Sequence, residues 1–143
     1  MEEFLSLPSC FPRQYHLVET SVTWTEAQSY CRQHYTDLAT VSSEEDVTKL
    51  NDTVGRHHSW IGLYYDINSW RWSLQNKSYY GEGEAEFRIW FSGEPNNYRS
   101  YENCVIMDPD GLWFDTPCFS ERPFVCYNGE NKTSGEFIKK KKK

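Results

Sequence analysis

The sequence lacks the hallmarks of membrane spans, of common enzymes and of zinc modules. No apolar stretch approaches the roughly 20 residues that a helix needs to cross a bilayer. There is no Gly-x-Ser-x-Gly turn, no Gly-rich phosphate loop and no His-Glu-x-x-His helix. The five cysteines never occur as Cys-x-x-Cys pairs, which argues against structural zinc. These absences predict a binding protein and not an enzyme.

Positive charge is scarce outside the C-terminal end. The formal net charge is −6, and Lys139 to Lys143 contribute +5, which leaves −11 for residues 1–138. Such an acidic body repels nucleic-acid phosphates and attracts cations. We therefore expect no nucleic-acid partner, and calcium is the more natural one.

Methionine is also scarce, whereas rings are abundant. The chain has two Met against six Trp, ten Tyr and eight Phe, and 38% of its 143 residues are hydrophobic. This is enough apolar material for one core, and rigid rings suit a loop-rich fold. We expect an extension over residues 1–9, one domain over 10–127 and a disordered polar and basic tail over 128–143.

Two helices are expected in the first half. Thr23 and Glu26 have the spacing of a capping box and open a helix over residues 23–34. Ser42 and Glu45 predict a second box, with a helix over 43–54 and Gly55 as its stop.

From Ser59 onward the pattern changes to short aromatic and β-branched runs that are typical of strands. These runs are 60–64, 70–72, 86–91 and 123–126. Residues 92–112 contain many Gly, Pro, Asn and Asp residues, which favour a long ordered loop without regular structure. Helices followed by strands predict an α+β fold.

The cysteines and the sequons indicate an oxidising, extracellular setting. The cysteines are Cys10, Cys31, Cys104, Cys118 and Cys126, and disulfides are their leading use. Sequons at Asn51, Asn76 and Asn131 predict glycosylation. The N-terminus has no signal-peptide pattern, so we expect either that a signal is missing from this sequence or that the domain belongs to a longer protein.

Several motifs in order then become recognisable. They are Trp24–Cys31, Asp37–Val41, Trp60–Leu63, Trp70–Trp72, Glu94–Asn96, Glu102–Cys104, Trp113–Asp115 and Phe124–Cys126. Together they resemble the C-type lectin-like domain over nearly all of residues 10–127. The resemblance implies a fold with two helices, short antiparallel sheets and a long calcium-binding loop.

The resemblance also implies a disulfide pairing that the sequence alone leaves open. Cys31 would pair with Cys126, and Cys104 with Cys118. Family members with an extra N-terminal hairpin carry two cysteines there, but this chain has only Cys10. Either this thiol is free or it forms an interchain disulfide in a dimer.

A calcium and sugar site is the function that the resemblance implies. The side chains that would bind the ion and the sugar are Glu94, Asn96, Glu102 and Asp115. Carboxylates accept hydrogen bonds from sugar hydroxyls and the Asn amide donates them. The order Glu-Pro-Asn, with a cis bond before Pro95, resembles members that bind mannose, fucose or N-acetylglucosamine. The partners would then be glycans or glycoproteins.

One residue departs from the family pattern. Phe114 stands where sugar-binding members carry Asn, so one ligand and one amide donor are missing. Asn97 and Asn103 also replace acids of a second calcium site, so we expect one ion at most. A metal-free site is the alternative, in a domain that binds protein through an exposed Phe114 or that binds ice or mineral.

Overall fold

The computed structural model describes residues 13–66, 69–75, 80, 82–97 and 102–129. Within these ranges, no helix is long and apolar enough to span a bilayer. Cys10, the sequons at Asn76 and Asn131 and the lysine tail lie outside the described residues, so the predictions made for them stay predictions.

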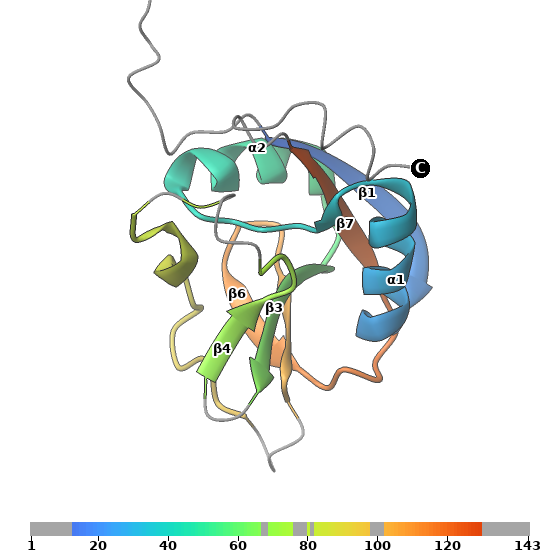
Figure 1. Ribbon diagram of the computed structural model, residues 1–143. Coiled ribbons are helices and arrows are strands. Elements are labelled where there is room, and N and C mark those ends of the chain that lie inside the picture. Colours follow the sequence, from blue (N-terminus) through green and yellow to red (C-terminus); the bar gives the residue numbers. More distant parts are fainter. Residues whose placement is uncertain (1–12, 67–68, 76–79, 81, 98–101, 130–143) are drawn as a thin grey trace, which may run out of the picture.

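Two helices and one mixed sheet form the fold (Figure 1). The elements are β1 (Arg13–Val22), α1 (Trp24–His34), β2 (Asp37–Leu38), α2 (Glu44–Val54), β3 (Ser59–Asp66), β4 (Ser69–Trp72), the 3-10 helix η3 (Glu84–Glu86), β5 (Cys104–Met107), β6 (Trp113–Thr116) and β7 (Arg122–Gly129). The strand order is β1-β7-β3-β5-β6, with β2 paired to β7 and β4 to β3. The predicted α+β class is confirmed.

The first and last strands of the chain lie side by side. In Figure 1, β1 in blue runs along β7 in red, and the two are antiparallel over most of their length. β7 also pairs with β2 and, in parallel, with β3. The other strand pairs are antiparallel, so one parallel contact joins the terminal strands to the strands of the second half.

Helix α1 begins with the capping box that the sequence predicts. Thr23 Oγ1 accepts a hydrogen bond from the Glu26 backbone N–H at 3.4 Å, and the Thr23 N–H donates to Glu26 Oε1 at 3.0 Å. Ala27 and Cys31, one turn apart, are fully buried. The apolar side of a short helix therefore faces the sheet.

Helix α2 begins one residue later than predicted. Its N-cap is Ser43, whose hydroxyl accepts from the Asp46 N–H at 3.2 Å, and not Ser42 paired with Glu45. Asp46 instead accepts from both the N–H and the hydroxyl of Ser42. Two adjacent serines before three acids allow either register, and local spacing alone does not separate them. Gly55 ends the helix at a φ of +60°, as expected.

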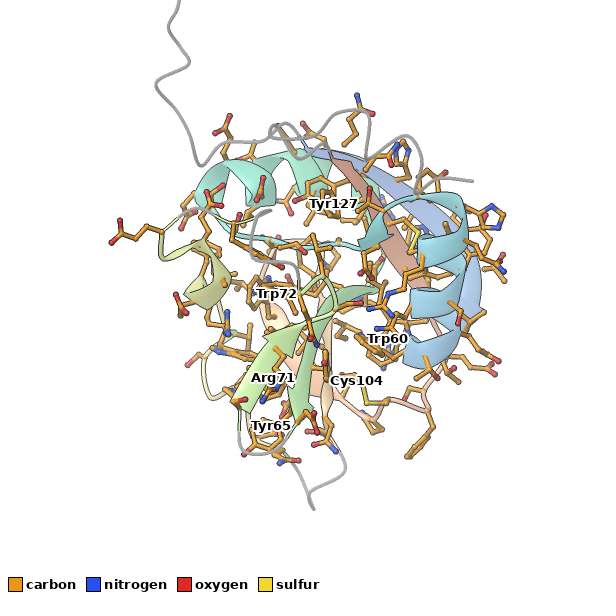
Figure 2. All side chains as sticks on the ribbon, in the orientation of Figure 1. Trp60, Tyr65, Arg71, Trp72, Cys104 and Tyr127 are labelled. Carbon is orange, nitrogen blue, oxygen red and sulfur yellow. A yellow bond between two sulfur atoms is a disulfide. The ribbon has the colours of Figure 1, made fainter. Side chains whose placement is uncertain are left out.

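Two buried clusters occupy opposite faces of β5. Val105 and Met107 belong to the first, and Cys104 and Ile106 belong to the second, because side chains alternate along a strand. The second cluster lies against α1 and contains Trp60, which Figure 2 shows beside the lower turns of that helix. The first contains residues of α2 together with Trp72 and Trp113.

Both predicted disulfides are present. Cys31 on α1 is bonded to Cys126 on β7, and Cys104 on β5 is bonded to Cys118 after β6. The Trp24 N–H donates to the Cys118 carbonyl at 3.1 Å, which joins the start of α1 to the second bridge. The first bridge thus links segments that are distant in sequence, and the second closes the hairpin formed by β5 and β6.

The prediction of a strand at 86–91 was wrong. Among these residues only Trp90 forms a bridge, with Trp113, and Glu86 belongs to η3. Phe87 and Ile89 pack half-buried against the first cluster in irregular backbone. Hydrophobic rings here satisfy core packing without a partner strand, so β propensity is overridden by tertiary context.

Four strands were not among the predicted runs, and two of them are the short strands β2 and β6. β5 lies inside residues 92–112, which we predicted to lack regular structure, and β1 was not predicted at all. All four residues of β5 are buried, so they show no alternation of polar and apolar side chains. Most side chains of β1 are at least partly exposed, which weakens its apolar signal.

We expect the two bridges to contribute differently to stability. They close loops of 95 and 14 residues, which in the chain-entropy model stabilise the fold by about 4.7 and about 3 kcal/mol respectively. Replacing Cys31 and Cys126 together by Ala should therefore lower the free energy of unfolding more than replacing Cys104 and Cys118. Guanidinium denaturation of both double variants measures this, and a larger loss for the second pair would contradict it.

Candidate functional site

The loop before β5 presents a bend at Pro95. The Glu94–Pro95 peptide bond is cis, as the resemblance implies, and Asn97 adopts a left-handed conformation with a φ of +44°. The Glu94 N–H donates to the Phe91 carbonyl at 2.8 Å. Asn is one of the few non-glycine residues that readily adopts this conformation. These features bring the backbone of residues 96 and 97 against Asp115 on β6.

Asp115 on β6 anchors this bend. Its Oδ1 accepts from the Asn96 N–H at 3.2 Å, and its Oδ2 accepts from the Asn97 N–H at 2.6 Å. The Asp115 side chain is buried, with 4% of the residue exposed. A buried side chain that accepts from two backbone donors fixes the loop above it.

Glu94 contacts Asn96 but is not fully satisfied. Its Oε2 accepts from the Asn96 Nδ2 at 3.2 Å, whereas its Oε1 is buried without a hydrogen-bond partner. The pKa of Glu94 is raised from 4.5 to about 7, mainly by burial, then by the neighbouring carboxyl of Asp115 and the charge of Glu102. The site therefore has more negative charge than its own donors neutralise.

Glu102 is the fourth predicted ligand, and it joins the other three through Asn97. Its backbone N–H donates to the Asn97 Oδ1 at 3.2 Å, and its side chain is half-buried. Within the described residues, no group of three or more His, Cys, Asp or Glu side chains is arranged to hold a metal ion. The structure brings Glu94, Asn96 and Asp115 together, and the ligand assignment stays a prediction.

Phe114 is not the exposed ring that we expected. It is half-buried, packs against the second cluster and stacks on Phe91, with ring centroids 4.6 Å apart and an interplanar angle of 23°. Packing on Phe91 and against the second cluster accounts for this burial. The exposed ring of the pair is Phe91, of which 41% is accessible, and sequence reasoning did not single it out.

Asn97 makes two contacts in the site that sequence reasoning did not predict. Its side chain and backbone bind Glu102 and Asp115 respectively, so it links the two predicted ligands across the loop. The signal was present as an Asn pair after Pro95, because Asn is favoured where a turn needs a positive φ.

Asn51, the described sequon residue, lies on α2 and is half-buried. Its Oδ1 is buried without a partner, and the amide lies against Gly111, where an added Cβ would stand 3.2 Å from that oxygen. Glycosylation of Asn51 stays a prediction, and it would require this amide to move away from Gly111.

A family model described as the lectin C-type domain matches residues 20–128, about three quarters of the chain. P-selectin from Rattus norvegicus is 31% identical over 120 residues, which cover 79% of this chain and 15% of the relative. L-selectin from Bos taurus is 32% identical over 125 residues, which cover 82% of this chain and 33% of the relative. The chain thus spans a third or less of these relatives.

Solved structures have the same fold. The cow carbohydrate-recognition domain of CD23, solved in the presence of a GlcNAc2Man3 oligosaccharide, is 29% identical, with a TM-score of 0.71 over 82% of this chain and 88% of that one. A calcium-independent type II antifreeze protein is 22% identical, with a TM-score of 0.70 over 86% and 92%. The latter likeness shows the fold alone.

We expect the pKa of Glu94 to report on the charge of its neighbours. In calcium-free buffer, Asp115→Asn should lower this pKa from about 7 toward 4.5, because a neutral amide replaces the neighbouring carboxyl that raises it. Carbon-detected NMR titration of the Glu94 side chain measures it. Glu102→Gln is the matched control and should lower the pKa less, because its effect is weaker. A pKa that stays near 7 in Asp115→Asn would contradict this assignment.

The same shift predicts how folding depends on pH. Because the pKa is higher in the folded protein than the ordinary 4.5, the folded state holds the extra proton. The associated stability is fully present below about pH 4.5 and is lost as the pH rises through about 7. Glu94→Gln should abolish this part of the pH dependence in calcium-free thermal denaturation. An unchanged profile in that variant would assign the dependence to another group.

Proposed function

Because the chain belongs to the C-type lectin domain family, we propose that it binds a sugar of the mannose, fucose or N-acetylglucosamine type through one calcium ion. Members of the family are binding proteins, and the chain is not an enzyme. We also propose an extracellular location, which agrees with its two disulfides. Its partners are then glycans or glycoproteins.

The partnerless Glu94 oxygen carries this proposal. An ionised carboxylate only accepts, so a buried oxygen without a donor is costly unless a cation or a donor reaches it. Asp115 lies beside it with both oxygens bound by backbone N–H groups, yet each carboxylate oxygen has a second lone pair. A hard cation with oxygen ligands fits this donor set.

The ligands that we propose for the ion are Glu94, Asn96, Glu102 and Asp115. When bound, calcium supplies positive charge and open coordination positions for two neighbouring sugar hydroxyls. Glu94 then accepts a hydrogen bond from one hydroxyl, and the Asn96 amide, which now donates to Glu94, donates to the same hydroxyl. The Glu94 to Asn96 hydrogen bond holds these two groups in neighbouring positions before any sugar arrives.

Phe114 weakens this site without removing its other ligands. A missing hydrogen bond or ligand at a polar partner costs roughly 1–3 kcal/mol, which is about one to two decades of affinity. Sites in extracellular modules bind calcium with a Kd on the order of 10⁻⁴ to 10⁻³ M. We therefore place the calcium affinity in the millimolar range or weaker, with useful avidity only from several linked domains.

Calorimetric titration of calcium into the chelator-treated domain tests the proposal. We expect saturation at millimolar calcium, and mannose heat that vanishes when chelator is added. Phe114→Asn should bind calcium about ten- to a hundredfold more tightly, because it restores an amide ligand. Glu94→Gln should abolish the heat, whereas Glu86→Gln, an exposed acid on η3, should not.

The outcomes separate the candidates. If the heat of calcium binding is unchanged in Glu94→Gln, the ion binds at another site. Absence of heat in the unmodified domain, together with binding in Phe114→Asn, would mean that this chain has lost its metal, and the calcium proposal would be wrong.

Calcium-independent protein binding is the second candidate, and the Phe91 and Phe114 stack favours it. Phe91 is an accessible ring supported from below, and aromatic anchors of this kind are enriched at the centres of interfaces. Phe119 is a further exposed ring, with 73% of it accessible. No contact in the described residues favours ice binding, because the likeness to the antifreeze protein shows only a shared fold.

If protein binding is the function, Phe91→Ala should weaken capture of the partner by about tenfold or more in chelator, because truncating an anchor ring costs about 2 kcal/mol or more. Biolayer interferometry against a receptor-ectodomain library measures this, with Phe119→Ala as the matched variant. Binding that needs calcium and tolerates Phe91→Ala would exclude this candidate.

A further inference from the structure

A cleft lies between α1, β2, β3 and the segment after β4. Its volume is about 620 Å³, within the range of small-molecule sites. Its lining residues are Gln28, Arg32, Thr36, Asp37, Tyr64, Ser73, Leu74 and Gln75. None of them belongs to the loop around Pro95 or to β6, so this cleft is separate from the proposed calcium site.

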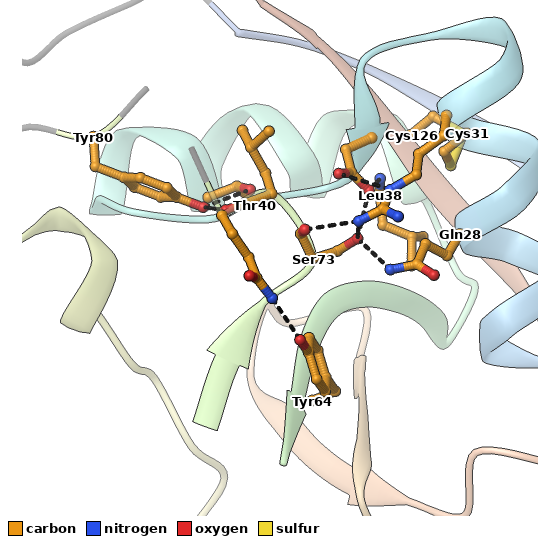
Figure 3. A network of polar contacts seen from close by, with 12 residues as sticks. Gln28, Cys31, Leu38, Thr40, Tyr64, Ser73, Tyr80 and Cys126 are labelled. Carbon is orange, nitrogen blue, oxygen red and sulfur yellow. Dashed lines mark hydrogen bonds and ion pairs between the residues drawn. A yellow bond between two sulfur atoms is a disulfide. The ribbon is translucent and has the colours of Figure 1, made fainter. Parts of the chain in front are cut away.

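The floor of the cleft is a fixed polar network around Ser73 (Figure 3). The Ser73 hydroxyl donates to Asp37 Oδ1 at 2.5 Å and accepts from Gln28 Nε2 at 2.8 Å. Figure 3 shows Gln28 and Ser73 pointing toward one another. Asp37 also accepts from the Leu38 N–H and from Arg32 Nε at 3.2 Å. Both Asp37 oxygens are therefore engaged inside the protein.

This network holds the Arg32 side chain in place but uses only some of its N–H donors. Its Nε donates to Asp37, and its Nη2 donates to the Ser73 carbonyl at 3.0 Å. Its Nη1 makes no hydrogen bond within the described part of the chain, and half of the side chain is exposed. An orientated guanidinium with free N–H donors is suited to a planar carboxylate.

Other groups around the cleft can form hydrogen bonds to ligand hydroxyls, and one residue offers apolar contact to the ligand. Gln28 uses its amide nitrogen and leaves its carbonyl oxygen as an acceptor. The Tyr64 hydroxyl accepts from Gln75 Nε2 at 2.6 Å and retains its own proton as a donor. Leu74 supplies apolar surface between them. The Arg32 guanidinium can bind a carboxylate, while the Tyr64 hydroxyl and the Gln28 carbonyl can bind hydroxyls. Together they complement a sugar ring that carries one carboxylate.

We propose that this cleft binds an acidic monosaccharide of the uronic acid type, with its carboxylate on Arg32 and its hydroxyls on Gln28 and Tyr64. The charge of the site limits the ligand to one negative charge. Asp37 lies 3.2 Å from Arg32, so the local charge is close to neutral and a phosphate dianion meets repulsion from Asp37. A neutral sugar leaves the Nη1 donors of Arg32 unused.

Heteronuclear NMR titration of the chelator-treated domain with sodium glucuronate tests this. We expect saturable shifts at the Leu38 and Ser73 amides with a millimolar Kd, at least tenfold weaker binding of glucose, and weaker binding of acetate. Arg32→Gln should weaken glucuronate binding by tenfold or more, whereas Arg71→Gln, the same charge change at an exposed residue of β4, should leave it unchanged. Tyr64→Phe, which keeps the ring, should weaken it several-fold.

The inference stands apart from the calcium proposal. Glucuronate shifts should persist in chelator and in Glu94→Gln, so failure of one proposal leaves the other intact. Equal binding of glucose and glucuronate, or of acetate and glucuronate, would overturn the assignment to an acidic sugar. The absence of saturable shifts at tens of millimolar glucuronate would remove the site altogether. Thermal denaturation of Arg32→Gln shows whether the variant is folded, and Tyr64→Phe provides the test if it is not.

Discussion

The bond between Cys31 and Cys126 is the constraint on which the remaining structure depends. Cys126 lies in β7, which pairs with β1, β2 and β3, so this strand joins the beginning of the chain to its second half. The bond fixes α1 against that strand, and the fully buried rings of Trp60 and Phe124 pack in the space between them. A loop-rich chain with short strands has few other ways to restrict its unfolded state, which is why one covalent contact has such wide influence.

Strand pairing connects β7 to the candidate site through β3, β5 and β6. β3 pairs with β5 and β5 with β6, and the Val105 to Asp115 pairing sets where the anchoring carboxylate stands. The Cys104 to Cys118 bond brackets this hairpin at its open end. The loop around Pro95 has little regular structure of its own, so Asp115 provides its geometry through two backbone hydrogen bonds. An irregular site is thus positioned by a regular strand beneath it.

The features that the sequence predicted are those with local or covalent causes. The Thr23 and Glu26 box lies within one helical turn, so its spacing was sufficient to identify α1. The disulfides, the cis bond before Pro95 and the proximity of Glu94 to Asn96 followed from the family resemblance. β5 escaped because both of its faces are buried, so its residues show no alternation of polar and apolar side chains. The cleft beside Arg32 was equally hidden, since its lining comes from three separated segments whose contacts are purely tertiary.

Phe114 acts on the site in two opposing ways. It removes an amide that a metal could use, but its stack on Phe91 stabilises the beginning of the loop that carries Glu94. The Phe91 N–H donates to the Trp113 carbonyl, and the Phe91 carbonyl accepts from the Glu94 N–H at 2.8 Å, so the ring pair and the backbone anchor the same point. Phe114 therefore removes one metal ligand but holds the loop that carries the remaining ligands in a fixed conformation. The cost in affinity of the substitution is then smaller than the count of lost ligand atoms alone implies, because a preorganised loop loses less entropy on binding.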